Sequence, residues 1–156
     1  MSYVRIWIHA VWGTKRRSPF LNNSIRGDIL RHILYNAQKK DIHIDIINGW
    51  HDHLHCLVSL KGEQSISQVM QLIKGESSFW INKEHLIRGK FEWADEYFAV
   101  SIGISSVRKV RDYIRNQEKH HRKKTWDEEY NEYIQQYGFE IFQSKEPQAE
   151  EPQAEA

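Results

Sequence analysis

The sequence predicts an α+β protein of ferredoxin-like topology, in which β-α-β-β-α-β segments form an antiparallel sheet with helices packed on it. Segments in which apolar and polar residues alternate, as they do in strands, are separated by segments with helical apolar spacing. These segments follow one another in the order stated, and further helical segments follow the last strand. A chain of 156 residues is long enough to bury a core.

The first part of the chain supplies a strand, a loop and a helix. Apolar residues occupy every second position from Tyr3 to Trp12, which predicts a half-buried strand. Residues 13–19 are rich in basic side chains and indicate a loop. Asn23 can cap a helix that runs to about Lys40, because its side chain accepts hydrogen bonds from the first amide groups of a helix.

Two further strands and a turn follow. Ile42, Ile44 and Ile46 alternate with polar residues, which predicts a second strand. The dipeptide Asn48-Gly49 is typical of a tight turn between paired strands. A third strand is then expected from about His51 to Leu60, so that the second and third strands form a hairpin.

The remaining segments complete the predicted topology. Ser65 and Gln68 are three residues apart and form a capping box at the start of a second helix. The pattern of residues 97–104 fits a fourth strand. A helix then begins at position 105 or 106 and runs to about 123, and a last helical segment covers roughly residues 126–137.

The formal net charge of +1 averages two unlike regions. Residues 143–156 contribute −3 and repeat Glu-Pro-Gln-Ala-Glu, so we expect a disordered acidic tail after one domain at 1–142. The domain therefore carries +4, and the stretch from Arg108 to Lys124 alone carries +6 with its histidines neutral. A helix this basic favours a partner that contains phosphate.

Cysteine content and hydropathy restrict the compartment. Cys56 is the only cysteine, so no internal disulfide can form and a reducing compartment is expected. No apolar run approaches the roughly 20 residues that a membrane-spanning helix needs. The sequence therefore predicts a cytoplasmic protein that has no membrane partner.

The third predicted strand contains a pair of histidines. Side chains alternate along a strand, so His53 and His55 project from one face, whereas Cys56 points to the other. This alternation argues against a site that joins Cys56 to the histidines. Two imidazoles on a rigid strand suit a divalent ion, with other positions left for further ligands. The alternative is that both histidines are polar residues on the open face of a sheet.

The basic helix after the fourth strand contains a second motif. Tyr113 and Gln117 are four residues apart, which places them one turn from each other on one edge of a helix. Apolar residues at helical spacing would dock this helix on the sheet. The alternative is that Tyr113 packs at the edge of the core and Gln117 lies on the surface.

Together these motifs resemble those of the single-tyrosine transposases of the HUH endonuclease superfamily. The superfamily has His-hydrophobic-His on a central strand, here His53-Leu54-His55, and a downstream helical Tyr-x-x-x-Gln, here Tyr113 to Gln117. The resemblance covers about residues 3–142 and includes relatives associated with repeated palindromes. It implies a metal-dependent tyrosine DNA endonuclease and strand transferase.

The resemblance also implies roles for individual residues. His53, His55 and Gln117 would bind one divalent metal, either Mg²⁺ or Mn²⁺. Tyr113, on the C-terminal catalytic helix, would attack single-stranded DNA next to a hairpin and form a 5′-phosphotyrosine intermediate. The family acts as a homodimer, in which the tyrosine helix of one subunit can complete the site of the other. It needs no nucleotide cofactor, and its DNA binding would associate the protein with the nucleoid.

Several other residues are candidates for a place near the site. His9 lies on the non-core face of the first strand, where it either lines the cavity or packs. His120 and His121 follow Gln117 by about one helical turn. Seven basic residues are predicted to contact DNA phosphates, namely Lys15, Arg16, Arg17, Lys74, Arg108, Lys109 and Arg115.

Two other functions are alternatives to an active transposase. The chain could be a domesticated protein that binds or nicks repeated hairpins, because such relatives share the same catalytic motifs. It could instead be a ferredoxin-like module that binds single-stranded RNA without catalysis. That class stacks bases on aromatic residues exposed on its sheet, whereas this strand carries histidines at the corresponding face.

Overall fold

The computed structural model describes residues 2–121 and 124–137. The chain divides into two units, residues 1–126 and 127–156. All four strands and the first four α-helices lie in the first unit. This unit contains every residue of the candidate site described below.

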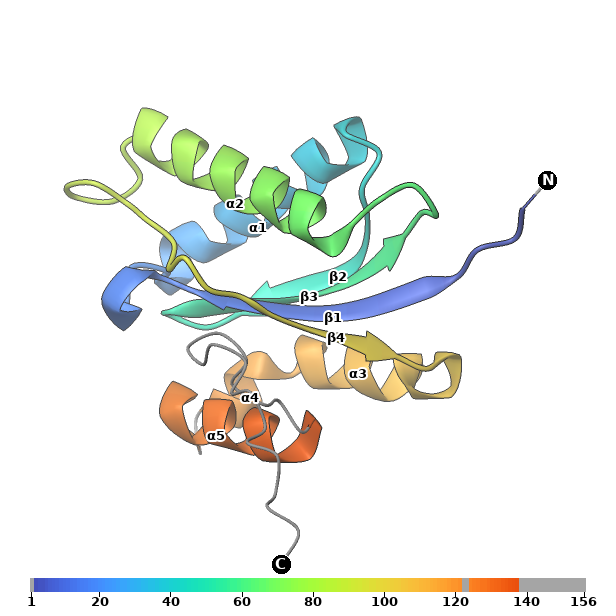
Figure 1. The fold of residues 1–156 in the computed structure, drawn as a ribbon. Helices are drawn as coiled ribbons and strands as arrows, with labels where there is room; N and C mark the ends of the chain where they lie inside the picture. The colour runs from blue at the N-terminus through green and yellow to red at the C-terminus, as the bar shows by residue number, and fades with distance from the viewer. Residues whose placement is uncertain (1, 122–123, 138–156) are drawn as a thin grey trace, which may run out of the picture. The chain divides into compact units, whose positions relative to one another are not determined.

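Four antiparallel strands form one sheet in the order β2-β3-β1-β4. Helices α1 and α2 cover one face of this sheet, and α3 lies against the other (Figure 1). The strand order and the layers confirm the predicted ferredoxin-like α+β topology. The elements are β1 (Ile6–Gly13), α1 (Asn23–Lys39), β2 (His43–Gly49), β3 (His53–Leu60), α2 (Ile66–Lys83), β4 (Phe98–Ile102) and α3 (Val107–Arg115).

The larger core fills the space between the sheet and the helices α1 and α2. Leu54, Cys56 and Val58 point into it from β3 and are fully buried, as the alternation of this strand predicts. Ile29 and Met70 meet them from the two helices. The side of β3 that carries His53 and His55 therefore faces away from this core.

A smaller core holds α3 on the opposite face of the sheet. Leu57 of β3 packs with Val107, Val110 and Ile114, which form the apolar stripe of α3. Partly buried side chains surround this cluster, namely Trp7, Ile46, Ile102 and Tyr113. This sheet face is therefore covered by a helix and is not open.

The two long helices begin with side-chain caps. The side chain of Asn22, one residue before the predicted cap Asn23, accepts hydrogen bonds from the amides of Ser24 and Ile25. Ser65 caps α2 as predicted, with its Oγ accepting from the amide of Gln68 at 3.2 Å.

Strand β2 departs from simple alternation at Asp45. Ile44 pairs with Val58 and Ile46 pairs with Leu57, so Asp45 is an extra residue in a β-bulge. As a result, Ile44 packs in the larger core, whereas Ile46 packs against the α3 cluster. The bulge thus lets one short strand serve both faces of the sheet.

The turn predicted at Asn48-Gly49 is wrong, because both residues belong to β2 and pair with His55 and Leu54. The chain reverses at residues 50–52 instead. A glycine is needed at position 49 because a Cβ atom there would lie 2.3 Å from the carbonyl oxygen of His53. The dipeptide therefore marks a close approach of two strands and not the turn itself.

The helix predicted to run to about residue 123 is interrupted. Helix α3 ends at Arg115, and Asn116 leaves the helical conformation with φ −98° and ψ 25°. A short helix, α4 (Gln117–His121), follows. The side-chain amide of Asn116 donates to the carbonyl oxygen of Asp112 at 2.9 Å, which stabilises the end of α3.

The last helix, α5 (Trp126–Tyr137), has the bounds that the sequence predicts. The predicted acidic tail at 143–156 lies outside the described residues. Within the part of the chain that the structure describes, no helix is both long enough and apolar enough to cross a membrane.

The close contact at Gly49 gives a test of the sheet geometry. We expect Gly49→Ala to lower the free energy of unfolding by about 1–3 kcal/mol, because the new methyl group collides with the backbone of β3. Gly75→Ala is the matched control, since a Cβ atom at that helical position meets nothing within 4 Å. The control should raise stability by about 0.5–1 kcal/mol.

Urea unfolding followed by tryptophan fluorescence measures both variants. Equal stability of Gly49→Ala and the parent protein would contradict the strand approach described here.

Candidate active site

His53 and His55 lie next to each other on the face of β3 that is turned towards α3. Their ring centroids are 5.1 Å apart, and both side chains are fully buried. Cys56 lies in the opposite core, and burial raises the pKa of its thiol to about 12. A protonated thiol across the sheet cannot join the histidines as a ligand, in agreement with the sequence pattern.

Each of these histidines makes a hydrogen bond through its Nδ1 atom. Nδ1 of His53 lies 2.7 Å from the carboxylate of Asp52, and Nδ1 of His55 lies 3.0 Å from Nε2 of His9. Both rings are thereby oriented so that Nε2 is the nitrogen that can bind a metal. The contact of Asp52 with His53 was not predicted from the sequence, although a carboxylate next to a candidate ligand is a signal that it orients the ligand ring.

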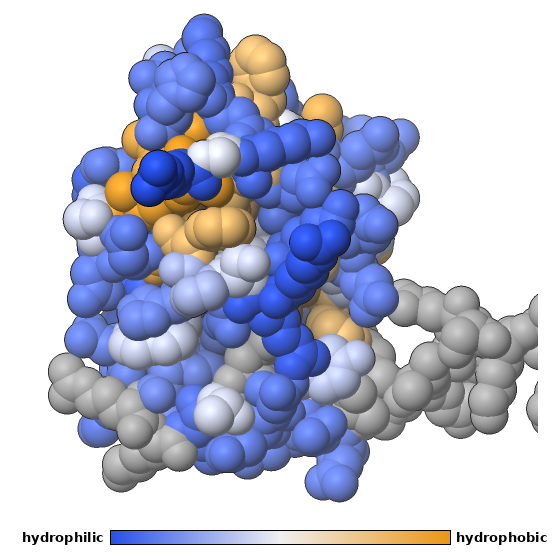
Figure 2. All heavy atoms as spheres, turned by 90° about the vertical axis from the view of Figure 1, so that its left-hand side faces the viewer, coloured by the Kyte–Doolittle hydropathy of each residue, from blue (hydrophilic) through white to orange (hydrophobic). Residues whose placement is uncertain are grey.

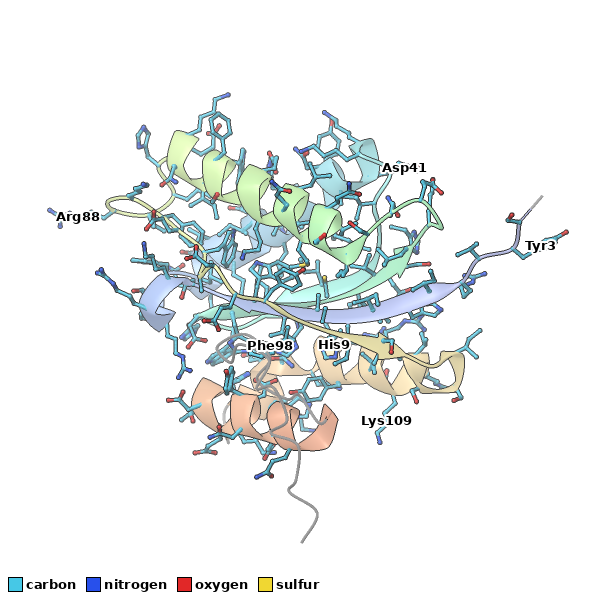
Figure 3. All side chains as sticks on the ribbon, in the orientation of Figure 1. Tyr3, His9, Asp41, Arg88, Phe98 and Lys109 are labelled. Carbon is cyan, nitrogen blue, oxygen red and sulfur yellow. The ribbon has the colours of Figure 1, made fainter. Side chains whose placement is uncertain are left out.

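Tyr113 of α3 lies beside the histidines of its own chain. Its ring centroid is 5.7 Å from that of His55 and 6.2 Å from that of His9. The ring of His120 is 4.7 Å away on the following helix. Figure 3 shows His9 between the sheet and the α3 layer. The structure thus brings the predicted nucleophile to the predicted metal ligands.

Gln117, the first residue of α4, is fully buried. Its side-chain Nε2 donates to the carbonyl oxygen of Tyr113 at 3.4 Å, so the two residues stay together across the break at Asn116. Its Oε1 lies 3.2 Å from Nε2 of His121, whose ring centroid is 4.6 Å from that of His53. His121 therefore connects Gln117 to the histidine pair.

Two polar contacts fix α3 to β2. The side-chain amide of Asn48 donates to the carbonyl oxygens of Ile114 and Arg115, at 3.0 Å each. Asp45, the bulge residue, forms a two-point ion pair with Arg111 at 2.7 and 3.0 Å. Hydrogen bonding to Asp45 raises the pKa of Arg111. These contacts hold α3 against the sheet on both sides of Tyr113 in the chain.

His53 and His55 offer two imidazole nitrogens from neighbouring positions of one strand face. Imidazole is a ligand that suits first-row divalent ions. His53 and His55 come from a strand and Gln117 from a helix that follows the docked α3. The contact of His53 Nδ1 with a carboxylate is the arrangement that metal-ligating histidines adopt.

The basic turn Lys15–Arg17 lies close to the histidine strand. It follows Gly13, which pairs with His53, and the amide of Thr14 donates to the carbonyl oxygen of Asp52 at 2.8 Å. Lys15 pairs with Glu92 at 2.9 Å, and this hydrogen bond is the main reason that the pKa of Glu92 is lowered. Figure 2 looks onto this end of the molecule, where hydrophilic surface surrounds a smaller apolar area.

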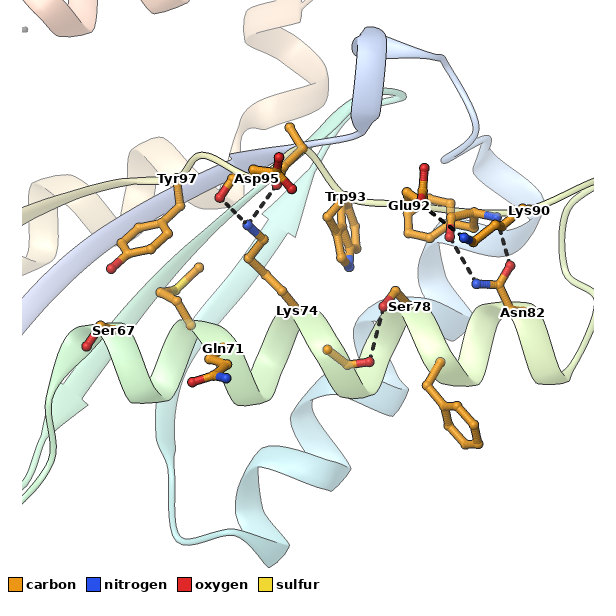
Figure 4. A pocket seen from close by; sticks show the side chains of 15 residues that line it. Ser67, Gln71, Lys74, Ser78, Asn82, Lys90, Glu92, Trp93, Asp95 and Tyr97 are labelled. Carbon is orange, nitrogen blue, oxygen red and sulfur yellow. Dashed lines mark hydrogen bonds and ion pairs between the residues drawn. The ribbon is translucent and has the colours of Figure 1, made fainter. Parts of the chain in front are cut away.

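The other predicted phosphate contacts lie elsewhere. Lys74 lines a cavity of about 550 Å³ beside α2, on the far face of the sheet (Figure 4). Its ammonium group donates to the carbonyl oxygens of Ala94 and Asp95 at 2.7 and 3.0 Å, and burial lowers its pKa. Three basic residues are exposed on α3, namely Arg108, Lys109 and Arg115.

The sequence matches the family described as IS200-like transposase over residues 2–117. The transposase for insertion sequence element IS200 of Salmonella typhimurium strain LT2 is 28% identical over 117 residues, which span 70% of this chain and 74% of the relative. The corresponding transposase of Salmonella typhi gives the same values.

Two solved structures share the fold. A candidate transposase from Deinococcus radiodurans R1 aligns with a TM-score of 0.61 and 20% identity, over 75% of this chain and 95% of that one. A REP-associated tyrosine transposase bound to a REP hairpin aligns with a TM-score of 0.57 and 21% identity, over 78% and 72% of the two chains. The sequence match covers both histidines, Tyr113 and Gln117, and this chain belongs to the IS200-like transposase family.

Proposed function

We propose that this transposase cleaves and rejoins single-stranded DNA at hairpin-marked ends, with Tyr113 as the nucleophile. The observation that carries the proposal is the position of Tyr113 beside His55 and His9, with its ring centroid 5.7 and 6.2 Å from theirs. Family membership supports DNA cleavage as the activity. The proposal for a hairpin substrate draws on the related tyrosine transposase, which was solved with a REP hairpin.

The proposed reaction is a transesterification. The phenolic oxygen of Tyr113 forms a bond to the scissile phosphorus, while the bond from phosphorus to the 3′ oxygen breaks. The phenolic proton leaves the nucleophile, and the departing 3′ oxygen takes up a proton, which yields a 5′-phosphotyrosine and a 3′-OH. Attack by a DNA 3′-OH on the phosphotyrosine reverses these bond changes and rejoins strands, so no nucleotide cofactor is needed.

The residues around Tyr113 address its weak nucleophilicity. A free tyrosine has a pKa of about 10 and is almost entirely protonated at neutral pH. His53, His55 and Gln117 would hold a divalent ion, Mg²⁺ or Mn²⁺, which would polarise the phosphate and stabilise charge that develops in the transition state. Gln117 is neutral, so this ligand set leaves the positive charge of the ion undiminished towards DNA.

The basic turn next to His53 is the best placed of the predicted phosphate contacts. Arg16 and Arg17 are exposed there, two and three residues beyond Thr14, whose amide donates to the carbonyl oxygen of Asp52. Lys15 in the same turn and the three basic residues of α3 would extend the contact with the DNA backbone. Lys74 is the least direct candidate, because its ammonium group already holds the 94–95 segment.

The fold argues against the RNA-binding alternative, because neither face of the sheet is open. Stacking of bases on a ferredoxin-like sheet requires an open sheet face. Here one face is covered by α1 and α2 and the other by α3, through the cluster around Leu57. A domesticated role in binding or nicking repeated hairpins uses the same residues and would differ in its biological substrate.

The nucleophile can be tested with Tyr113→Phe, which removes only the phenolic oxygen. We expect wild-type protein with Mg²⁺ and a pool of single-stranded hairpin DNAs to form a covalent adduct that survives a denaturing gel. Tyr113→Phe should reduce the adduct at least 1,000-fold, roughly the loss expected when a nucleophile is removed. The control Tyr35→Phe alters an exposed tyrosine of α1 and should leave the adduct unchanged.

An adduct that persists in Tyr113→Phe would show that another residue is the nucleophile. DNA binding without an adduct in the wild type would favour the hairpin-binding alternative.

The metal site can be tested by binding of Mn²⁺ in the absence of DNA. We expect His53→Ala and His55→Ala each to weaken Mn²⁺ binding by more than about 10-fold, because each removes one of few protein ligands. His43→Ala is the matched control, since His43 is an exposed histidine on the neighbouring strand. Electron paramagnetic resonance of free Mn²⁺ gives the dissociation constants, and unchanged values in both variants would rule out this site.

The proposed homodimer raises the question of which chain supplies the tyrosine. In this structure Tyr113 meets the histidines of its own chain, so we propose that each site is built within one subunit. A mixed dimer of Tyr113→Phe and His53→Ala chains, purified through two different tags, would then contain no complete site. We expect no more adduct from it than from the two variants alone.

An adduct formed by the mixed dimer would show that the tyrosine acts on the partner's site. Failure of the two tags to co-purify would contradict the homodimer itself.

A further inference from the structure

A buried hydrogen bond joins the first strand to one of the two candidate metal ligands. Nε2 of His9 lies 3.0 Å from Nδ1 of His55, and both side chains are at most 1% exposed. His9 stands in the middle of β1, which pairs with β3 on one side and β4 on the other. Its backbone is therefore held on both edges, and its ring has a fixed position against His55.

The position of the hydrogen atom is fixed in the contact of His53 with Asp52, but not in the contact of His55 with His9. A neutral imidazole carries one N–H, on either Nδ1 or Nε2. The carboxylate of Asp52 can only accept a hydrogen bond, so Nδ1 of His53 must be the donor. For His55 the partner is another imidazole, and the hydrogen atom between them can belong to either ring.

Only one of these two arrangements is compatible with a metal. If His9 donates, then Nδ1 of His55 accepts and its Nε2 carries the hydrogen, which blocks the lone pair that a metal needs. If His9 accepts, then Nδ1 of His55 donates and its Nε2 carries the lone pair that a metal needs. This second arrangement is the one that His53 adopts, because Nδ1 of His53 donates to Asp52.

We infer that His9 is a positioning residue, whose Nε2 accepts a hydrogen bond from Nδ1 of His55 and so selects the ring form that can bind a metal. The inference deepens the proposed function and rests on it, because it assigns His55 as a ligand. His9 itself binds no metal in this arrangement, since its Nε2 lone pair is directed to His55. His9 thus orients His55 as Asp52 orients His53, but His9 lies on the neighbouring strand β1, whereas Asp52 directly precedes its partner.

Two substitutions separate hydrogen bonding from packing. His9→Leu places an apolar side chain at this buried position and removes the hydrogen-bond acceptor. His9→Gln supplies an amide oxygen as a hydrogen-bond acceptor, at about the same distance from the backbone as the lost Nε2. We expect His9→Leu to raise the dissociation constant for Mn²⁺, measured without DNA, by about 10–100-fold, as other changes to groups that orient a ligand do. His9→Gln should recover most of the affinity.

Equal Mn²⁺ affinity of wild type and His9→Leu would overturn the inference. So would equal losses in the Leu and Gln variants, because then the ring and not the acceptor would matter. If the wild-type protein itself binds no Mn²⁺, the proposed metal site fails, which is a separate result. Urea unfolding of both variants identifies any loss that comes from a damaged fold.

The ring form of His55 can also be observed without any substitution at His9. Nitrogen-15 chemical shifts of the wild-type imidazoles distinguish a ring with hydrogen on Nδ1 from one with hydrogen on Nε2, and His55→Ala assigns the signals. We expect hydrogen on Nδ1 of His55 in metal-free protein. Hydrogen on Nε2 would show that His9 donates, and the inference would be wrong even if the metal binds.

Discussion

The antiparallel pairing of β1 with β3 is the contact on which the rest of the site depends. The register places His9 opposite Leu57, two residues from His55, and this diagonal spacing lets two long side chains on one face meet. The same register places Gly13 opposite His53, so the basic turn after β1 begins at the histidine pair. A slip of one residue would turn His55 and His9 to opposite faces. Strand pairing and site geometry are therefore one constraint.

Helix α3 depends on the same sheet but is held by different contacts. Its apolar stripe packs on Leu57, which lies two residues after His55 on the same face of β3. Polar contacts then fix its rotation, through the pair of Asp45 with Arg111 and the two bonds from Asn48. Apolar packing alone is non-directional and would allow the helix to slide. The polar contacts give Tyr113 a defined place beside the histidines.

Much of this arrangement follows from local patterns in the sequence. Alternation along β3 was enough to put His53 and His55 on one face and Cys56 on the other, and spacing was enough to pair Tyr113 with Gln117. The functions of Asn48 and Asp45 could not be predicted, because their partners lie 66 residues away in the chain. The tight-turn dipeptide was misleading for the same reason, since the glycine answers to a neighbouring strand. The break at Asn116 could not be predicted from the spacing of apolar residues, because it depends on the side chain of Asn116, which caps the end of α3.

The ring of His53 is oriented by a local contact, and the ring of His55 is oriented by a contact that is distant in the chain. His53 is held by the residue before it, so its orientation depends only on the start of β3. His55 is held by His9, 46 residues earlier in the chain, so its orientation requires a correctly paired sheet. The proposed metal site therefore requires the pairing of β1 with β3, whereas Tyr113 is placed by the packing of α3 on the same face. Because β1 also leads into the Lys15–Arg17 turn, one central strand links His9, which contacts His55, to the basic side chains that we propose contact the DNA backbone.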